Sequence, residues 1–202
     1  MCGLVQRLDG LPLAIELAAA RLNTLSLDEI LERLAGRFQL LRSRGREAQA
    51  LEGALDWSWD LLEPFEQAAL AQVSIFRGGF SLAAAESVVD VSPWKDCPAM
   101  FEIVAALSDN SLLLKTPAED GSVRYGLLES IRAYAERKLN TPGALQGERS
   151  GPEAVGAAKI RHAAHFARLG ESNYLSDLTG FGSTARWKAL FLDLANLVVA
   201  ID

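Results

Sequence analysis

Apolar residues recur at helical spacing from the start of the chain. The members of the first series are Leu11, Ala14, Ile15, Ala18 and Leu22. Steps of three and four residues place them on one face of an α-helix. Pro12 suits the first turn, because a backbone N–H there would have no partner within the helix. We therefore expect a largely buried helix that begins near Pro12.

A second helix is predicted after a short turn. Ser26 and Glu29 have the spacing of a capping box, in which each side chain accepts a hydrogen bond from the backbone N–H of the other residue. An apolar stripe follows as far as residue 41, and a polar connector then contains Arg42, Arg44 and Arg46. Such a run of charge is usually solvated, with a phosphate or partner contact as the alternative.

The next ninety residues change from helical to strand periodicity. Helices are predicted from about Gln49 to Leu62, from Glu63-Pro64 to the Gly78-Gly79 break, from Ser81 to about Asp90, and from Met100 to Leu107. Residues 112–116 and 123–127 then alternate as strands of a hairpin. One more helix, with Ile131, Ala135 and Leu139 facing inward, follows the hairpin. This order is that of a winged helix-turn-helix.

The whole chain is thus predicted to be mainly α-helical, with a β-hairpin as its wing. Four segments are expected: a helical domain at 1–46, a winged-helix domain at 49–139, a linker at 140–152 rich in Gly, Pro and Ser, and the start of a helical region at 153–202. The last segment should hold helices at about 153–172 and 183–201. Both ends of the sequence interrupt a helical pattern, so we expect a fragment of a longer protein.

Composition narrows the function classes. Half of the 202 residues are apolar and the formal net charge is −6, which disfavours non-specific attraction to phosphates or anionic lipids. Cys2 and Cys97 are the only cysteines, which fits a reducing cytoplasm. No run of apolar residues in the sequence is long enough to span a membrane, and no signal peptide is recognisable.

Direct DNA binding by this part of the chain is not expected from its charges. A recognition helix needs basic or amide side chains for bases and phosphates. Residues 82–107 carry the acids Glu86, Asp90, Asp96 and Glu102 against Lys95 alone. In the wing, Arg124 is opposed by Glu119 and Asp120. The winged helix is therefore interpreted as a packing module.

No catalytic or metal centre is predicted. His162 and His165 lie three residues apart on a predicted helix, but no further ligand completes a tetrahedral set. The Ser and Cys residues lack the context of a triad. Four tryptophans are scattered and are expected to be core or interface anchors: Trp57, Trp59, Trp94 and Trp187.

Several motifs together resemble a known family. In chain order they are GLPLAIELAAARL (10–22), LDWSWDLL (55–62), FRGGFSLAAAESV (76–88), LSDNSLL (107–113), YGLLESIRAYAERKL (125–139), RHAAHFARL (161–169) and DLANL (193–197). The series resembles the STAND class of NB-ARC-like signalling ATPases, and within it bacterial transcriptional regulators of the AfsR and LuxR-associated kind. The resemblance implies a P-loop ATPase core upstream and a TPR-like helical repeat downstream as packing partners, and ATP or ADP with Mg²⁺ as the parent protein's cofactor. A fragment cut from such a core should expose an apolar patch, so we also expect a tendency to dimerise.

The chain itself contains no G-x-x-x-x-G-K-[ST] motif, so neither catalysis nor a bound cofactor is expected in the fragment. By resemblance, Leu11 and Pro12 would lie beside the adenine and Glu129 beside the ADP phosphates. Leu128 occupies the usual histidine position, and Arg132 could take over its charged role. The local alternatives are that Pro12 only starts a helix, that Glu129 is only favoured in a first helical turn by the helix dipole, and that Arg132 is solvated.

The expected function is that of a regulatory arm. It would pack on the ATPase core of a nucleotide-switched transcriptional regulator and relay a signal from the repeats. Two alternatives stay open: a DNA-binding winged-helix module, and a plain helical scaffold for protein partners.

Overall fold

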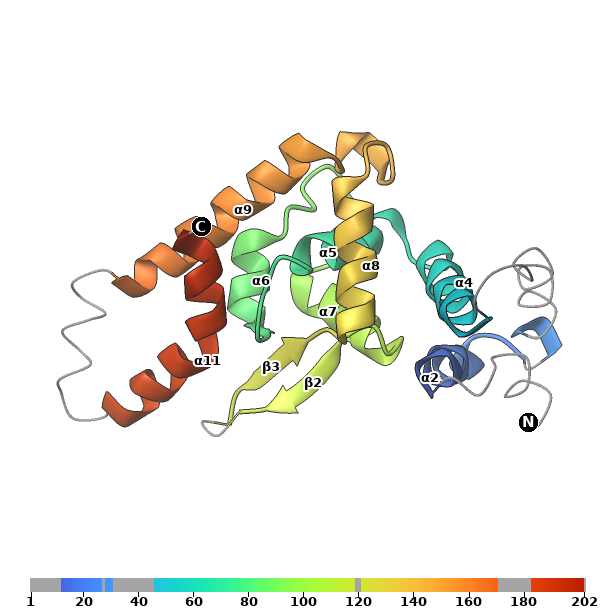
Figure 1. Cartoon of the computed structure of the whole chain (residues 1–202), viewed down its shortest axis with the longest axis horizontal. Coiled ribbons are helices and arrows are strands. Elements are labelled where there is room, and N and C mark those ends of the chain that lie inside the picture. The colour runs from blue at the N-terminus through green and yellow to red at the C-terminus, as the bar shows by residue number, and fades with distance from the viewer. Residues whose placement is uncertain (1–11, 27, 31–45, 119–120, 171–182, 202) are drawn as a thin grey trace.

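The computed structural model describes residues 12–26, 28–30, 46–118, 121–170 and 183–201. Its helices are α2 (Pro12–Ala20), α4 (Arg46–Asp60), α5 (Pro64–Val73), α6 (Leu82–Val88), α7 (Met100–Asp109), α8 (Glu129–Asn140), α9 (Pro152–Ala167) and α11 (Ser183–Ile201), with 3-10 turns η1 (Arg21–Asn23), η2 (Gln146–Glu148) and η3 (Arg168–Gly170). The strands are β1 (Phe80–Ser81), β2 (Leu114–Pro117) and β3 (Val123–Gly126). The prediction of a mainly helical fold with a β-hairpin is confirmed (Figure 1).

The N-terminal elements follow their local signals. Pro12 is the first residue of α2, as expected. The capping box also forms, because Glu29 Oε2 accepts a hydrogen bond of 2.8 Å from Ser26 N, and Ser26 Oγ accepts one of 3.3 Å from Glu29 N. Arg46 begins α4 and so lies in a helix instead of the predicted connector. Arg42 and Arg44 lie outside the described residues.

The winged helix-turn-helix is built from α5, β1, α6, α7, β2 and β3 in that order. Capping interactions set its helix starts: Glu66 Oε2 accepts from Glu63 N at 2.9 Å before α5, and Ser81 Oγ accepts from Ala84 N at 3.1 Å at the start of α6. The two-residue strand β1 pairs antiparallel with β3, so the sheet order is β1-β3-β2. Sequence periodicity predicted the hairpin but not β1.

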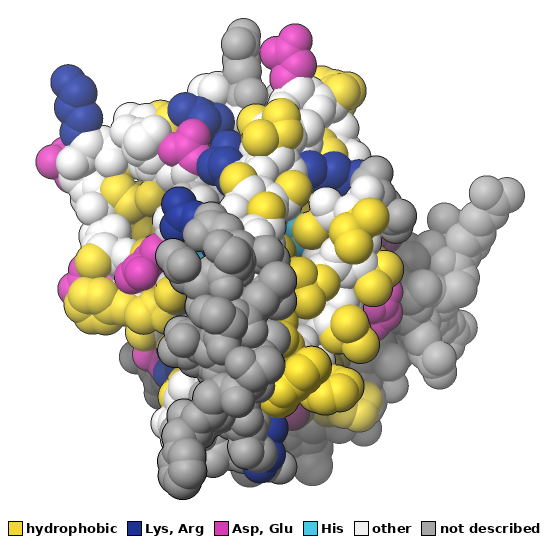
Figure 2. All heavy atoms as spheres, turned by 90° about the vertical axis from the view of Figure 1, so that its left-hand side faces the viewer, with side chains coloured by type: hydrophobic (Ala, Val, Ile, Leu, Met, Phe, Trp, Pro, Cys, Tyr) yellow, Lys and Arg dark blue, Asp and Glu magenta, His cyan; other side chains and the backbone are white. Residues whose placement is uncertain are grey.

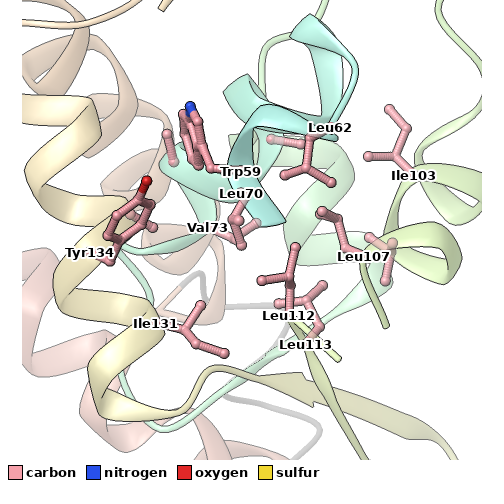
Figure 3. Packing of buried hydrophobic residues seen from close by; sticks show 14 of the residues in the cluster. Trp59, Leu62, Leu70, Val73, Ile103, Leu107, Leu112, Leu113, Ile131 and Tyr134 are labelled. Atoms are coloured by element: carbon pink, nitrogen blue, oxygen red, sulfur yellow. The ribbon is translucent and has the colours of Figure 1, made fainter. Parts of the chain in front are cut away.

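One part of the hydrophobic core lies between α4, α5, α7 and α8 (Figure 3), and the same cluster of buried residues extends to α2, α6 and α9. Buried residues from these helices, from the turn between α4 and α5 and from the turn after α7 pack together there, among them Trp59, Leu62, Leu70, Val73, Ile103, Leu107, Leu112, Leu113, Ile131 and Tyr134. Trp59 and Tyr134 meet edge to face, with ring centroids 5.8 Å apart. Trp57 is also buried, so both tryptophans of α4 are core anchors.

The C-terminal helices pack against the winged helix at the end of the molecule opposite to α2 (Figure 1). Helix α9 contacts α6 and α8, and Arg161 on it donates hydrogen bonds to Val88 O at 2.6 Å and to Gln72 Oε1 at 2.7 Å. The segment between α8 and α9 turns back on itself, since Gly151 N donates to Leu139 O at 2.7 Å. The expected domain boundaries at residues 46, 139 and 152 stay predictions.

The outer face of α9 and α11 is rich in hydrophobic side chains (Figure 2). The most exposed of them are Ile160 at 71%, Phe191 at 70% and Ile201 at 86%. Even so, none of the helices in the described ranges is long and apolar enough to cross a membrane.

Candidate nucleic-acid interface

Helix α7 occupies the recognition position of the winged helix-turn-helix. Its inner side chains Ile103, Val104 and Leu107 are buried in the core. Phe101, which is 56% exposed, and Glu102 lie on the opposite side. This outward face is amphipathic and could enter a groove of duplex DNA, where apolar side chains contact thymine methyl groups.

Charge on this face is unfavourable to phosphates. Helix α7, described over all its residues, carries the exposed acids Glu102 and Asp109 and neither Lys nor Arg. Glu102 is partly engaged, because its Oε2 accepts a hydrogen bond of 3.0 Å from Ala99 N at the helix start. Helix α7 therefore offers shape and apolar contacts more than electrostatic attraction.

The wing supplies the nearest cations. Lys115 on β2 is exposed and pairs in register with Tyr125, whereas Arg124 on β3 pairs with Thr116. The Arg124 side chain is only 12% exposed, since its guanidinium lies 2.6 Å from Asp193 Oδ1 on α11. Lys115 is thus open to a phosphate while Arg124 is held within the protein.

A cavity of about 420 Å³ lies beside the wing, between the loop before β1, the hairpin and the start of α8. Its lining includes Gly78, Gly79, Tyr125 and three arginines: Arg77, Arg124 and Arg132. Glu129 lines the same cavity. The wall of the cavity is therefore mixed, with apolar side chains such as Phe80 and Leu127 beside more cationic than anionic ones.

Ion pairs organise this wall. Arg132 binds Glu129 one turn away on α8, and its Nη1 lies 3.2 Å from Glu136 Oε2. Arg77 reaches the same Glu136 oxygen at 3.5 Å. The hydrogen bond from Arg132 lowers the pKa of the Glu129 carboxyl and raises that of the guanidinium. Both groups are therefore ionised at neutral pH.

The structure brings together only part of the expected nucleotide set. Glu129 and Arg132 both line the cavity, whereas Pro12 begins α2, at the end of the molecule opposite to α11, and is not among the lining residues. Leu11 lies outside the described residues. Leu128, in the position expected for a histidine, is half-buried and packs against the core. Arg77 was missed by sequence reasoning, because nothing local links residue 77 to the start of α8.

The two histidines on α9 belong to an aromatic cluster. His162 is buried, with its ring centroid 5.2 Å from Phe76 and 4.7 Å from Phe166. Burial lowers the pKa of both His162 and His165. Across the described residues, no group of three or more His, Cys, Asp or Glu side chains is placed to hold a metal ion.

Comparison with known proteins identifies the central fold. Residues 62–140 match the family described as a winged helix-turn-helix domain. A protein of Mycobacterium tuberculosis named "Putative HTH-type transcriptional regulator" is 39% identical over 145 residues, which are 68% of this chain and 16% of that protein. A second protein of that species, whose name states no function, is 38% identical over 146 residues, or 36% of its length. The chain therefore spans about a sixth to a third of these relatives.

These matches correct one sequence-based expectation. Direct DNA binding was not expected from the acidic balance of residues 82–107, but a winged helix-turn-helix with relatives named as transcriptional regulators points to DNA binding. One of the acids in that count, Asp90, is paired within the fold, because its Oδ2 lies 2.7 Å from Arg149 Nη1. Residues 62–140 are a winged helix-turn-helix domain, in a chain similar to HTH-type transcriptional regulators of mycobacteria.

Proposed function

We propose that this chain is the DNA-binding winged-helix module of a larger transcriptional regulator. The observation that carries the proposal is the order α5-β1-α6-α7-β2-β3, in which a two-helix unit is followed by a hairpin wing. The names of the mycobacterial relatives support it. Since the chain spans a minor part of those proteins, the remainder of the regulator is expected to supply effector recognition.

In this mode α7 enters the major groove and the wing lies along the backbone. Phe101 and Ala105 would meet thymine methyl groups, and Lys115 would contact a phosphate. The acids Glu102 and Asp109 weaken attraction to any duplex. The dissociation constant for non-specific DNA is therefore expected at the weak end of the usual range, at about 100 µM. Shape and apolar contacts, more than phosphate contacts, would then carry the specificity.

The test is binding to a fluorescent random-sequence duplex, followed by selection of preferred sites from a random library. Lys115→Gln should weaken binding to every duplex and reduce the slope of log affinity against log salt by about 0.9, because one phosphate contact is lost. Lys159→Gln is the matched control, since Lys159 is exposed on α9, away from the wing. Equal effects of both substitutions, or no binding by the wild type at low salt, would contradict the proposal.

The cavity beside α8 favours a second candidate, that of an arm regulated by a nucleotide. Arg77 and Arg132 could meet the phosphates of an ADP held by a neighbouring P-loop ATPase domain of the parent protein, with Glu129 positioning Arg132. If so, Arg132→Gln should speed ADP release from the intact regulator, whereas Lys159→Gln should not. An intact protein that binds neither ATP nor ADP with Mg²⁺ would rule this candidate out.

A further inference from the structure

Helix α11 is attached to the base of the wing by a buried asparagine. Asn196 is fully buried; its Oδ1 accepts a hydrogen bond of 2.6 Å from Arg77 N, and its Nδ2 donates one of 2.8 Å to Gly79 O. Both backbone groups belong to the loop before β1. One side chain therefore satisfies a donor and an acceptor in a segment 117 and 119 residues away along the chain.

The same helix holds the arginine of the wing. Arg124 Nη2 donates to Asp193 Oδ1 at 2.6 Å and also lies 3.2 Å from the carbonyl oxygens of Gly79 and Leu192. The Asp193 side chain is only 20% exposed. This ion pair is better shielded from solvent than a typical surface pair, which contributes little.

Gly78 allows the close approach of α11, and Gly79 allows that of β3 to the same loop. A Cβ at Gly78 would lie 3.2 Å from the Cβ of Ala195 on α11, and one at Gly79 would lie 2.8 Å from Tyr125 O on β3. Both residues have positive φ, at 73° and 92°. The FRGGF and DLANL motifs are thus explained as the two halves of one docking contact.

The contact changes the charge that the wing presents. Within the described part of the hairpin, residues 114–118 and 121–126, the basic side chains are Lys115 and Arg124. Docking of α11 neutralises Arg124 with Asp193 and leaves Lys115 open. We propose that α11 is an intramolecular clamp that withholds Arg124 from DNA phosphates, so that release of α11 strengthens DNA binding by the wing. The masking effect rests on the proposed DNA-binding function, whereas the clamp itself does not.

Asp193→Asn tests the clamp, because it removes the charge that holds Arg124 while keeping the shape of the side chain. Glu153→Gln makes the same change in net charge at an exposed position at the start of α9, far from the wing (Figure 1). The first readout needs no DNA: modification of Arg124 by phenylglyoxal, followed by mass spectrometry. Asp193→Asn should speed this modification several-fold, and Glu153→Gln should leave it at the wild-type rate. Equal rates in all three proteins would overturn the clamp.

The second readout is binding to the random duplex. Freeing one cation adds one phosphate contact. The slope of log affinity against log salt should therefore steepen by about 0.9 in Asp193→Asn, which corresponds to a roughly threefold larger loss of affinity between about 50 and 200 mM salt. Arg124→Gln in the Asp193→Asn background should abolish that change. Faster modification with unchanged binding, in a protein whose wild type binds the duplex, would overturn the masking. If neither wild type nor variant binds any duplex, the proposed function and the masking both fail, and the modification rates still decide the clamp.

Discussion

Arg21 and Asn110 join the N-terminal helix to the end of the recognition helix. Asn110 directly follows the last residue of α7, and its Oδ1 accepts a hydrogen bond of 2.7 Å from Arg21 Nη1. Arg21 Nη2 donates a second hydrogen bond, of 3.1 Å, to the carbonyl oxygen of Ser58 on α4. Arg21 is 5% exposed, and burial lowers the pKa of its guanidinium. The charge is thus held in the interior by these acceptors.

We expect Asn110→Ala to destabilise the protein more than a surface substitution would. It leaves a buried guanidinium short of one acceptor, and such a loss costs about 1–3 kcal/mol. Arg21→Ala should remove most of the effect of Asn110→Ala, because no buried charge is then left unpaired. A double-mutant cycle by urea unfolding measures the coupling. A coupling energy near zero would show that the two residues act independently.

Gly79→Ala should be more destabilising than Gly143→Ala. Both glycines have positive φ, at 92° and 74°, so both substitutions incur the left-handed strain of about 1–2 kcal/mol. A Cβ at Gly79 also lies 2.8 Å from Tyr125 O, whereas nothing lies within 4 Å of one at Gly143. The difference between the two free energies of unfolding isolates the steric contribution. Equal values would mean that the wing moves away without cost.

Local signals in the sequence were sufficient for most helix starts. Pro12, the Ser26–Glu29 box and Ser81 each act within three or four residues, so their effects are readable from sequence alone. Strand β1 was missed because two residues have no periodicity, and only their pairing with β3 defines them as a strand.

The candidate site was less accessible to sequence reasoning. Glu129 and Arg132 are one turn apart, so their pairing follows from helix geometry. Arg77 and Asn196 are separated by 119 residues, and only the packing of α11 on the loop before β1 brings them together. A count of charges along 82–107 likewise could not show that Asp90 is paired with Arg149, 59 residues further along the chain.

Stability should fall as the pH is lowered through the range in which histidine titrates. Burial lowers the pKa of His162 and His165 below the value of about 6.5 expected in the unfolded chain. The unfolded state then binds more protons, so stability is fully present above about pH 6.5 and is lost below it, at up to about 1.4 kcal/mol per pH unit for each histidine.

His162→Phe should reduce that pH dependence, because phenylalanine fits an aromatic neighbourhood and does not titrate. The measurement is the free energy of urea unfolding at several values between about pH 7.5 and 5.5, compared as slopes so that a change in packing does not interfere. Lys159→Gln serves as the control with an unchanged slope. A wild-type stability that is flat over this range would contradict the assignment of a neutral buried His162.

Neutralising the acids of α7 should strengthen DNA binding if this helix faces the duplex. Asp109→Asn removes an exposed negative charge next to the C-terminus of the helix, where it also opposes the helix dipole. Glu102→Gln keeps an oxygen that can accept the hydrogen bond from Ala99 N while losing the charge.

Each change should raise affinity for a random duplex, and the gain should shrink as salt rises, because like-charge repulsion is screened within a Debye length of about 8–10 Å. Glu153→Gln on α9 alters net charge equally and should have little effect. Equal gains from all three substitutions would mean that overall charge, and not the placement of α7 in the groove, governs the interaction.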